Sequence, residues 1–445
     1  MQTEICININ KTLGNIKPMH CVNNGPVGRS NYEQRSNFAS FAALNIPFVR
    51  NHDASLSEAY GSQHVVDVHC IFPDFSRDPN DAAAYDFDIT DYYNETVYLV
   101  GSKVFYRLGS SIEHWVHKYG TLVPADYNKW VDICEHIIMH YTEGWADGFY
   151  YDMPYWEIWN EPDLDPDDAT NKRTWGGTRA QFFDLYELAA KRLKARFPHL
   201  KIGGPALAGD QAWAEAFLSE MQRRGVPIDF FSWHIYTTDP HRISKTAKKI
   251  CELTEKYGYG FAENILNEWN YVDDWSRPLD YLKVIKGLKG ASFITAVFCE
   301  MQINSDVDML MYYDARVEKI WNGLFSSDTL MPLKGYYSFK AFDVLYQMGT
   351  LVPLNFTDGE VYALAARSEC SAAVLLTNYA KETPQEKKIS LDFEGVPEGT
   401  YCKIYTLDEE TDLALTAEIP LTNGKFTFPL PAYNTCLIKV DVHRG

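Results

Sequence analysis

The sequence lacks the features that mark several classes of protein. It contains no apolar run of about 18 residues, so we expect no membrane-spanning helix. The segment Met1 to Glu4 shows no basic region leading into an apolar one. We therefore expect no signal peptide and a cytoplasmic location, although removal of a leader would leave the same sequence. Lysine and arginine number 41 against 60 aspartates and glutamates, and the net charge of −19 argues against nucleic-acid and anionic membrane partners.

Motifs for cofactors and metals are also missing. The nine cysteines are scattered and odd in number, without the close pairs that bind zinc, so we expect reduced and mostly buried thiols. No Gly-x-Ser-x-Gly elbow and no phosphate-binding loop occurs. His136 and His140 have the spacing of metal ligands on a helix, but the segment lacks the glutamate of metalloproteases. The acidic run 163–168 could bind calcium, although a solvated loop is the simpler interpretation. We expect neither a metal nor a cofactor.

What is present is a long alternation of strands and helices from residue 14 to residue 348. Short apolar runs are each followed by an amphipathic helical segment. The predicted strands are Ile16–Val22, Pro47–Arg50, Lys103–Leu108, Tyr155–Trp159, Leu200–Gly203, Phe230–Tyr236, Ile265–Trp269 and Met309–Tyr313. The predicted helices are Tyr32–Leu44, Tyr92–Gly101, Ala125–Thr142, Ala180–Arg196, Ala212–Arg223, Ile243–Tyr257, Leu279–Val297 and Tyr336–Met348. Eight such repeats predict an α/β protein with a (β/α)8 barrel, the TIM barrel. A doubly wound open sheet is the alternative, but no Gly-rich phosphate turn follows the first strand.

The C-terminal part has a different pattern. From Gly349 onward, short alternating runs are separated by turn signals such as Asp358-Gly359 and Asn423-Gly424. We expect a C-terminal antiparallel β-sandwich over residues 349–445. The N-terminal segment 1–13 also alternates, with isoleucines at every second position, and we expect its strand to join this sandwich.

Two carboxyl groups follow strands that face each other across the predicted barrel. Active sites of this fold lie at the carboxyl ends of the strands. Asn160 and Glu161 end the fourth strand, and Glu268 lies near the end of the seventh. Alone, either glutamate could be a loop carboxylate that caps a helix or pairs with an arginine. Together they suit glycoside hydrolysis, in which one carboxyl protonates the leaving oxygen and the other attacks the sugar or activates water.

The surroundings of the two glutamates differ in the sequence. Glu161 is crowded by tryptophans at 156 and 159, and burial of this kind raises a carboxyl pKa. Glu268 lies between Asn267 and Asn270, whose amides we expect to hold an ionised carboxylate. Glu157 shares the inward face of the fourth strand, and we expect it deeper in the barrel. Environments that separate two pKa values are typical of an acid and a nucleophile.

The motifs around these glutamates resemble those of a known family. Residues 156–162 read Trp-Glu-Ile-Trp-Asn-Glu-Pro, and residues 267–270 read Asn-Glu-Trp-Asn. Together these motifs resemble the clan A retaining glycosidases. With Ser-Trp-His-Ile-Tyr at 232–236, His52-Asp53 and the β-rich tail, the chain resembles glycoside hydrolase family 39, which holds β-xylosidases and α-L-iduronidases. The nucleophile segment departs from the family pattern, which has threonine in place of Asn267.

The resemblance implies a role for each matching residue. Glu161 would be the acid/base and Glu268 the nucleophile, and Asn160 would hydrogen-bond the sugar 2-hydroxyl. The resemblance also makes His52, His234, Tyr236 and Trp321 substrate-binding candidates. Tyr313 is a further candidate because it lies at the end of the eighth strand. For Tyr313, packing in the core is the equally simple alternative.

The sequence thus predicts a retaining exo-glycosidase, most similar to β-xylosidases, that acts on an oligosaccharide or glycoside. An α-L-iduronidase-like or related exo-glycosidase is the second candidate, and it would need a cation in the pocket from Arg50, Arg107 or Arg316. A carbohydrate-binding barrel without catalysis is the non-enzyme alternative. The oligomeric state stays open, with a homo-oligomer among the possibilities.

Overall fold

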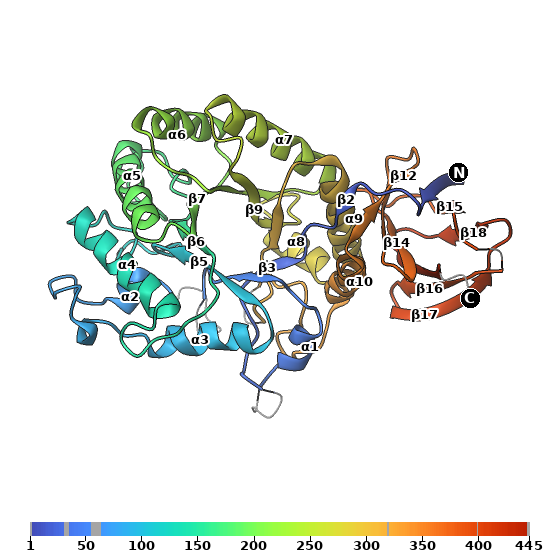
Figure 1. The fold of residues 1–445 in the computed structure, drawn as a ribbon, viewed down its shortest axis with the longest axis horizontal. Coiled ribbons are helices and arrows are strands. Elements are labelled where there is room, and N and C mark those ends of the chain that lie inside the picture. The colour runs from blue at the N-terminus through green and yellow to red at the C-terminus, as the bar shows by residue number, and fades with distance from the viewer. Residues whose placement is uncertain (1, 31–34, 55–63, 318–319, 398, 443–445) are drawn as a thin grey trace.

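A closed barrel of eight parallel strands dominates the fold (Figure 1). The structure is a computed structural model that describes residues 2–30, 35–54, 64–317, 320–397 and 399–442. The barrel strands are β3 (Cys21–Asn23), β4 (Phe48–Arg50), β5 (Lys103–Leu108), β6 (Tyr155–Ile158), β7 (Lys201–Leu207), β8 (Phe230–Tyr236), β9 (Glu263–Asn270) and β10 (Met309–Tyr312). Strand β10 pairs with β3 and closes the ring. The predicted barrel is therefore confirmed.

Helices follow the barrel strands and surround them. They are α1 (Phe38–Ala42), α3 (Asp88–Leu99), α4 (Tyr127–Thr142), α5 (Arg179–Arg196), α6 (Gln211–Arg224), α7 (Pro240–Lys256), α8 (Pro278–Ile285), α9 (Leu288–Asn304) and α10 (Lys334–Met348). Two short helices, α2 (Val68–Ile71) and η1 (Ala82–Ala84), lie in the long insertion after β4. Side-chain caps mark several starts. Thr178 and Gln181 form a reciprocal capping box at α5, and Asp210 accepts two backbone N–H groups at α6.

Two predicted helices depart most from the structure, and the helix predicted at Tyr92–Gly101 begins earlier, at Asp88 of α3. The single helix predicted at Leu279–Val297 is in fact two, α8 and α9, because Gly287 adopts an extended backbone between them. After proline, glycine is the residue that is least favourable inside a helix. Interrupting the helix at Gly287 therefore costs little. The helix predicted at Tyr32–Leu44 begins only at Phe38, and its first predicted residues, 32–34, lie outside the described residues.

The interior of the barrel has an apolar floor beneath a polar layer. The floor consists of buried side chains from the early parts of the strands: Cys21, Phe105, Tyr155, Phe230, Ile265, Met309 and Met311. Above it lie Arg50, Glu157, Ser232 and Asn267, all without solvent exposure. Because buried charges need partners, this layer is held by a dense hydrogen-bond network. The network supports the residues that follow the strands.

The C-terminal part forms two further sheets. A seven-stranded sheet has the order β17-β16-β19-β14-β13-β11-β2, and a four-stranded sheet has the order β12-β1-β15-β18. Their strands are β1 (Gln2–Asn8), β2 (Gly14–Asn15), β11 (Thr350–Val352), β12 (Leu354–Asn355), β13 (Val361–Arg367), β14 (Ser371–Asn378), β15 (Lys387–Glu394), β16 (Tyr401–Leu407), β17 (Asp412–Pro420), β18 (Lys425–Leu430) and β19 (Thr435–Asp441). A separate apolar core lies between the two sheets. The predicted β-sandwich is confirmed.

The N-terminal strand β1 lies in this sandwich, as Figure 1 shows by the blue strand beside β15 and β18. Its isoleucines at 5 and 7 are buried, while Glu4 and Cys6 beside them are exposed. One detail differs from the prediction of an antiparallel sandwich, since β1 runs parallel to β15. Helices α9 and α10 contact β13 and β14, so the sandwich packs on the last helices of the barrel. We propose a domain division between residues 348 and 349, where α10 ends.

Among the described residues, no helix has both the length and the apolar character needed to cross a membrane.

Candidate active site

The turn after β6 holds Glu161 in an unusual backbone conformation. Trp159 has φ 76° and Glu161 has φ 47°, so the predicted strand stops at Ile158, before Trp159. The indole of Trp159 donates to Thr174 O, and the indole packs where a side chain at Gly109 would otherwise stand. Glu161 N donates to Ala206 O at 2.8 Å. Such left-handed residues persist only where the surroundings fix them, and they cluster at functional sites.

A β-bulge places Glu268 in the pocket. The register of β9 shifts by one residue against both neighbours, since Trp233 pairs with Leu266 while His234 pairs with Glu268. Asn267 is the extra residue. In a regular strand, Asn267 and Glu268 would point to opposite faces. The bulge breaks this alternation, so both side chains reach polar partners inside the barrel.

Arg50 joins the two halves of the polar layer. Its guanidinium donates to Glu157 Oε2 and Glu268 Oε1, each at 2.8 Å, and to Asn160 Oδ1 at 2.7 Å. It also donates to Asn23 Oδ1 at 3.1 Å. The arginine side chain has no solvent exposure. Arg50 therefore positions the nucleophile candidate and the amide of Asn160.

Glu157 is the deeper carboxyl that the sequence predicts. Besides the Arg50 contact, it accepts from Ser232 Oγ at 2.6 Å and from Asn267 Nδ2 at 2.5 Å. Both oxygens are thus hydrogen-bonded, and the residue is fully buried. The prediction that Asn267 and Asn270 hold Glu268 is wrong. Asn267 binds Glu157 because of the bulge, and Asn270 donates to backbone oxygens of residues 313 and 321.

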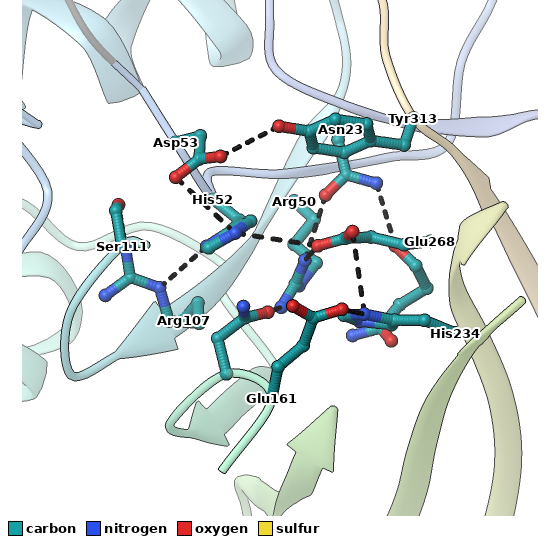
Figure 2. Close-up of polar contacts among 12 residues, drawn as sticks. Asn23, Arg50, His52, Asp53, Arg107, Ser111, Glu161, His234, Glu268 and Tyr313 are labelled. Atoms are coloured by element: carbon teal, nitrogen blue, oxygen red, sulfur yellow. Dashed lines mark hydrogen bonds and ion pairs between the residues drawn. The ribbon is translucent and has the colours of Figure 1, made fainter. Parts of the chain in front are cut away.

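The two candidate carboxyls meet at His234 (Figure 2). His234 Nδ1 lies 2.8 Å from Glu161 Oε1 and 3.5 Å from Glu268 Oε2. One oxygen of each glutamate and a nitrogen of His234 all lie within 4.8 Å of one another. Among the residues that the structure describes, these three are the group whose atoms could hold a metal ion. The expectation of a metal-free site therefore stays a prediction.

Burial shifts the protonation of Glu161 and His234. Burial raises the pKa of Glu161 to about 7, although the charge of Arg50 acts in the opposite direction. Burial lowers the pKa of His234 to about 4, partly offset by Glu268. Near neutral pH, His234 is thus uncharged and a substantial fraction of Glu161 carries a proton. This is the state that a general acid requires.

Glu268 has a different set of partners. Arg50 Nη1 donates to Oε1 at 2.8 Å, and the Tyr236 hydroxyl donates to Oε2 at 2.9 Å. His52 Nε2 lies 3.5 Å from Oε1. Burial raises the pKa of Glu268, and the charges of His234 and Arg50 oppose that rise. Because Arg50 bonds Glu268 directly and makes no such bond to Glu161, the contacts favour the ionised carboxylate at Glu268.

A chain of contacts fixes the tautomer of His52. Arg107 Nε donates to His52 Nδ1 at 3.2 Å. The charge of Arg107 is balanced by Asp67, whose Oδ1 lies 2.5 Å from Arg107 Nη2. Burial lowers the pKa of His52 well below its ordinary value, so the ring is neutral. Since Nδ1 accepts, the single ring proton lies on Nε2, which faces Glu268 and Asp53. No sequence signal marks Asp67, because it lies in the insertion after β4 rather than at a strand end.

Aromatic rings form one wall of the site. The ring of Trp321 lies 5.6 Å from that of Tyr236, 5.7 Å from that of Trp275 and 6.4 Å from that of Tyr313. The Tyr313 hydroxyl donates to Asp53 Oδ2 at 2.8 Å. The structure therefore brings together every site residue that the sequence singled out. Trp275 is an aromatic neighbour that the sequence analysis missed.

The remaining candidates from the sequence have structural partners. His140 contacts Asp91 and the Trp145 carbonyl, and His136 contacts the Asp132 carbonyl. We predicted a solvated loop for the acidic run 163–168, but the structure shows that this run is only partly solvated. Its first carboxyl, Asp163, accepts the backbone N–H groups of residues 208, 209 and 210. This contact ties the turn that carries Glu161 to the loop after β7.

The chain is similar to known glycoside hydrolases. The family model for glycosyl hydrolases family 39 matches residues 5–262. A beta-xylosidase of Geobacillus stearothermophilus is 36% identical over 124 residues, which are 27% of this chain and 23% of that protein. A beta-xylosidase of Caldicellulosiruptor saccharolyticus is 33% identical over 133 residues, 30% of this chain and 26% of that protein. The matched region spans about a quarter of each relative.

The whole fold has a counterpart among solved structures. A glucosidase from Croceicoccus marinus superposes with a TM-score of 0.81 at 20% sequence identity, covering 100% of this chain and 99% of that one. Identity this low establishes the shared fold alone.

Proposed function

The chain belongs to glycosyl hydrolases family 39, and from this membership we propose that it is a retaining exo-glycosidase of the β-xylosidase type. Glu161 is the acid/base and Glu268 the nucleophile in this proposal. The observation that supports this proposal best is the short distance between the two carboxyls: one oxygen of Glu161 lies within 4.8 Å of one oxygen of Glu268. Retaining enzymes place the two carboxyl groups about 5–5.5 Å apart, whereas inverting enzymes leave about 6.5–9.5 Å for a water molecule.

The proposed reaction proceeds in two displacements. Glu268 attacks the anomeric carbon while Glu161 protonates the departing oxygen, so the glycosidic bond breaks and a glycosyl ester forms on Glu268. Glu161, now ionised, takes a proton from the incoming water. The water attacks the anomeric carbon, which releases Glu268 and restores the original configuration. Arg50 and Tyr236 support this cycle by hydrogen-bonding the carboxylate that must be ionised.

The other site residues have proposed binding roles. Asn160 is held by Arg50 through its oxygen, which leaves its amide nitrogen to bind the sugar 2-hydroxyl. His52 and Tyr313 surround the innermost sugar, His234 and Tyr236 contact it beside the carboxyls, and Trp321 supplies an apolar wall.

A neutral sugar suits the pocket better than a uronic acid. The iduronidase-like alternative needs a cation for the sugar carboxylate. Arg50 already binds two carboxylates, and Arg107 is paired with Asp67. Arg316 donates to the Pro26 carbonyl and lies over the Tyr93 ring. The xylosidase names of the two relatives favour the same choice.

A panel of aryl glycosides tests the proposed function. We expect hydrolysis of an aryl β-xyloside, with the first product keeping the β configuration when it is followed by proton NMR. Release of the α anomer would overturn the retaining mechanism. Binding of the whole panel without any turnover would instead support the non-catalytic barrel.

The pH dependence tests the assignment of Glu161. Since the pKa of Glu161 is raised to about 7 and its acid form is the active one, kcat/KM should fall as pH rises through about 7. Glu161→Gln should remove this limb and lower kcat/KM about 100-fold on glycosides with poor leaving groups. The His234 pKa of about 4 lies too low to produce the same limb. A limb that persists in Glu161→Gln would contradict the assignment.

A further inference from the structure

A basic cleft opens beside the active site. It has a volume of about 600 Å³ and continues from Tyr236 and His234 past the loop after β7 to helix α7 and Trp275. Three cations of α7 line it, namely Arg242, Lys245 and Lys249. All three side chains are exposed, and their spacing places them on one face of the helix. In a chain with a net charge of −19, such a cluster next to the site is a local reversal of charge.

These cations are available to a ligand. None of the three forms a salt bridge with another described residue. The one carboxylate in the lining is Asp239, and it already accepts the His241 backbone N–H at the start of α7. The cleft therefore carries more positive than negative charge and attracts an anion.

The cleft lies on the side of the acid rather than that of the innermost sugar. Its wall at Ala208 and Gly209 is hydrogen-bonded to Asp163, two residues after Glu161. Its inner end includes His234, which contacts Glu161. The group that Glu161 protonates must leave past this carboxyl. His52, which we place around the innermost sugar, lies at the other oxygen of Glu268: its Nε2 is 3.5 Å from Oε1, whereas His234 Nδ1 is 3.5 Å from Oε2.

We propose that this cleft is the leaving-group subsite and that it selects a leaving sugar with a carboxylate, that is, a uronic acid. The proposal rests on the glycosidase function proposed above. Trp275 is 59% exposed and lies 5.2 Å from the Tyr236 ring, so it offers an apolar face to a sugar ring at the entrance. The lysines and Arg242 then meet the carboxylate.

The surroundings favour a carboxylate over a phosphate. Helix N-termini commonly bind phosphate through free backbone N–H groups. At α7 this role is blocked, because Asp239 caps the helix and Pro240 has no N–H. What remains is a set of side-chain cations beside one carboxylate, which suits a singly charged anion.

Two matched disaccharides test the proposal. One carries glucuronate as the leaving sugar and the other glucose, with the same β-xylosyl group and linkage. We expect kcat/KM to be about tenfold higher for the glucuronate compound at low ionic strength, as two exposed charge contacts would give. The preference should shrink in about 0.5 M salt, because exposed charges are screened.

Variants on α7 locate the preference. The double variant Lys245→Ala/Lys249→Ala should bring the ratio of the two kcat/KM values close to one. Lys248→Ala is the matched control, since Lys248 is an exposed lysine of the same helix that does not line the cleft. It should keep both the ratio and the basal activity. An unchanged ratio in the double variant would overturn the proposal.

Binding separates this proposal from the proposed function. Affinities of both disaccharides for Glu161→Gln, measured by titration calorimetry, need no turnover. Selective binding of the acid by a protein whose wild type cleaves no glycoside would support the subsite and overturn the glycosidase function. Cleavage of aryl xylosides by the wild type, together with equal affinities of Glu161→Gln for the two disaccharides, would support the glycosidase function and overturn the subsite. Tighter binding of a glucose 6-phosphate analogue would overturn the assignment to a carboxylate.

Discussion

Replacing Glu268 with alanine should lower kcat on an activated aryl xyloside by on the order of 10⁴-fold, as removal of a nucleophile does in other covalent mechanisms. The reason is local, because in the proposed mechanism Glu268 is the carboxylate that forms the bond to the anomeric carbon. Glu157 lies deeper and has both oxygens hydrogen-bonded. Initial rates and a single-turnover measurement would give the loss.

The alanine variant also offers a test with a chemical product. Azide can occupy the space that the carboxylate leaves and attack the same face of the sugar. We expect azide to restore part of the rate and to yield a glycosyl azide of inverted configuration. Glu263→Ala is the matched control, since Glu263 lies at the other end of the same strand, where it pairs with Lys201. If Glu268→Ala keeps the wild-type rate, the nucleophile lies elsewhere.

Replacing Arg50 with methionine should lower the free energy of unfolding by about 3–5 kcal/mol. The variant leaves Glu157 and Glu268 buried close together without their shared cation. Burial already raises the pKa of Glu268, and the loss of Arg50 raises it further. A carboxyl whose pKa is higher in the folded state than in the unfolded state destabilises the folded protein as pH rises. The loss of unfolding free energy in Arg50→Met should therefore be small below about pH 4.3 and grow toward neutral pH.

Denaturant unfolding at several pH values measures this effect. Adding Glu157→Gln to Arg50→Met should recover part of the stability, because one buried charge is removed, while activity stays low. The control is Arg223→Met, since Arg223 is 68% exposed and its pair with Glu220 should contribute less than about 1 kcal/mol. Equal losses for the two arginine variants would mean that the buried network does not depend on Arg50.

The sequence predicted most of the architecture because the strands have clear local signals. Strands β5 and β8 have the predicted bounds, since each is a run of apolar and aromatic residues that ends at a polar turn. Strand β17 has apolar residues at every second position from Leu413 to Ile419, yet it lies at the exposed edge of its sheet. None of the nine residues of β17 is fully buried, so its alternating apolar residues do not mark a buried face of the sheet.

The site was predictable up to the point where the backbone becomes irregular. Counting strands placed Glu161 and Glu268 opposite each other, and the structure brings them together at His234. The amide partners of Glu268 were predicted wrongly, because the prediction assumed a regular strand and β9 contains a bulge at Asn267. The central position of Arg50 depends on contacts with three other strands, which no local pattern encodes.

The pairing of β1 has a consequence for biosynthesis. Strand β1 is synthesised before the barrel strands, yet its partners are β12 and β15, which begin at Leu354 and Lys387. Its buried isoleucines therefore stay without their sheet until the whole barrel has been translated. Contacts this distant along the chain slow folding. The sandwich can close only after the barrel residues have been synthesised, so its completion reports that a full-length catalytic domain has been made.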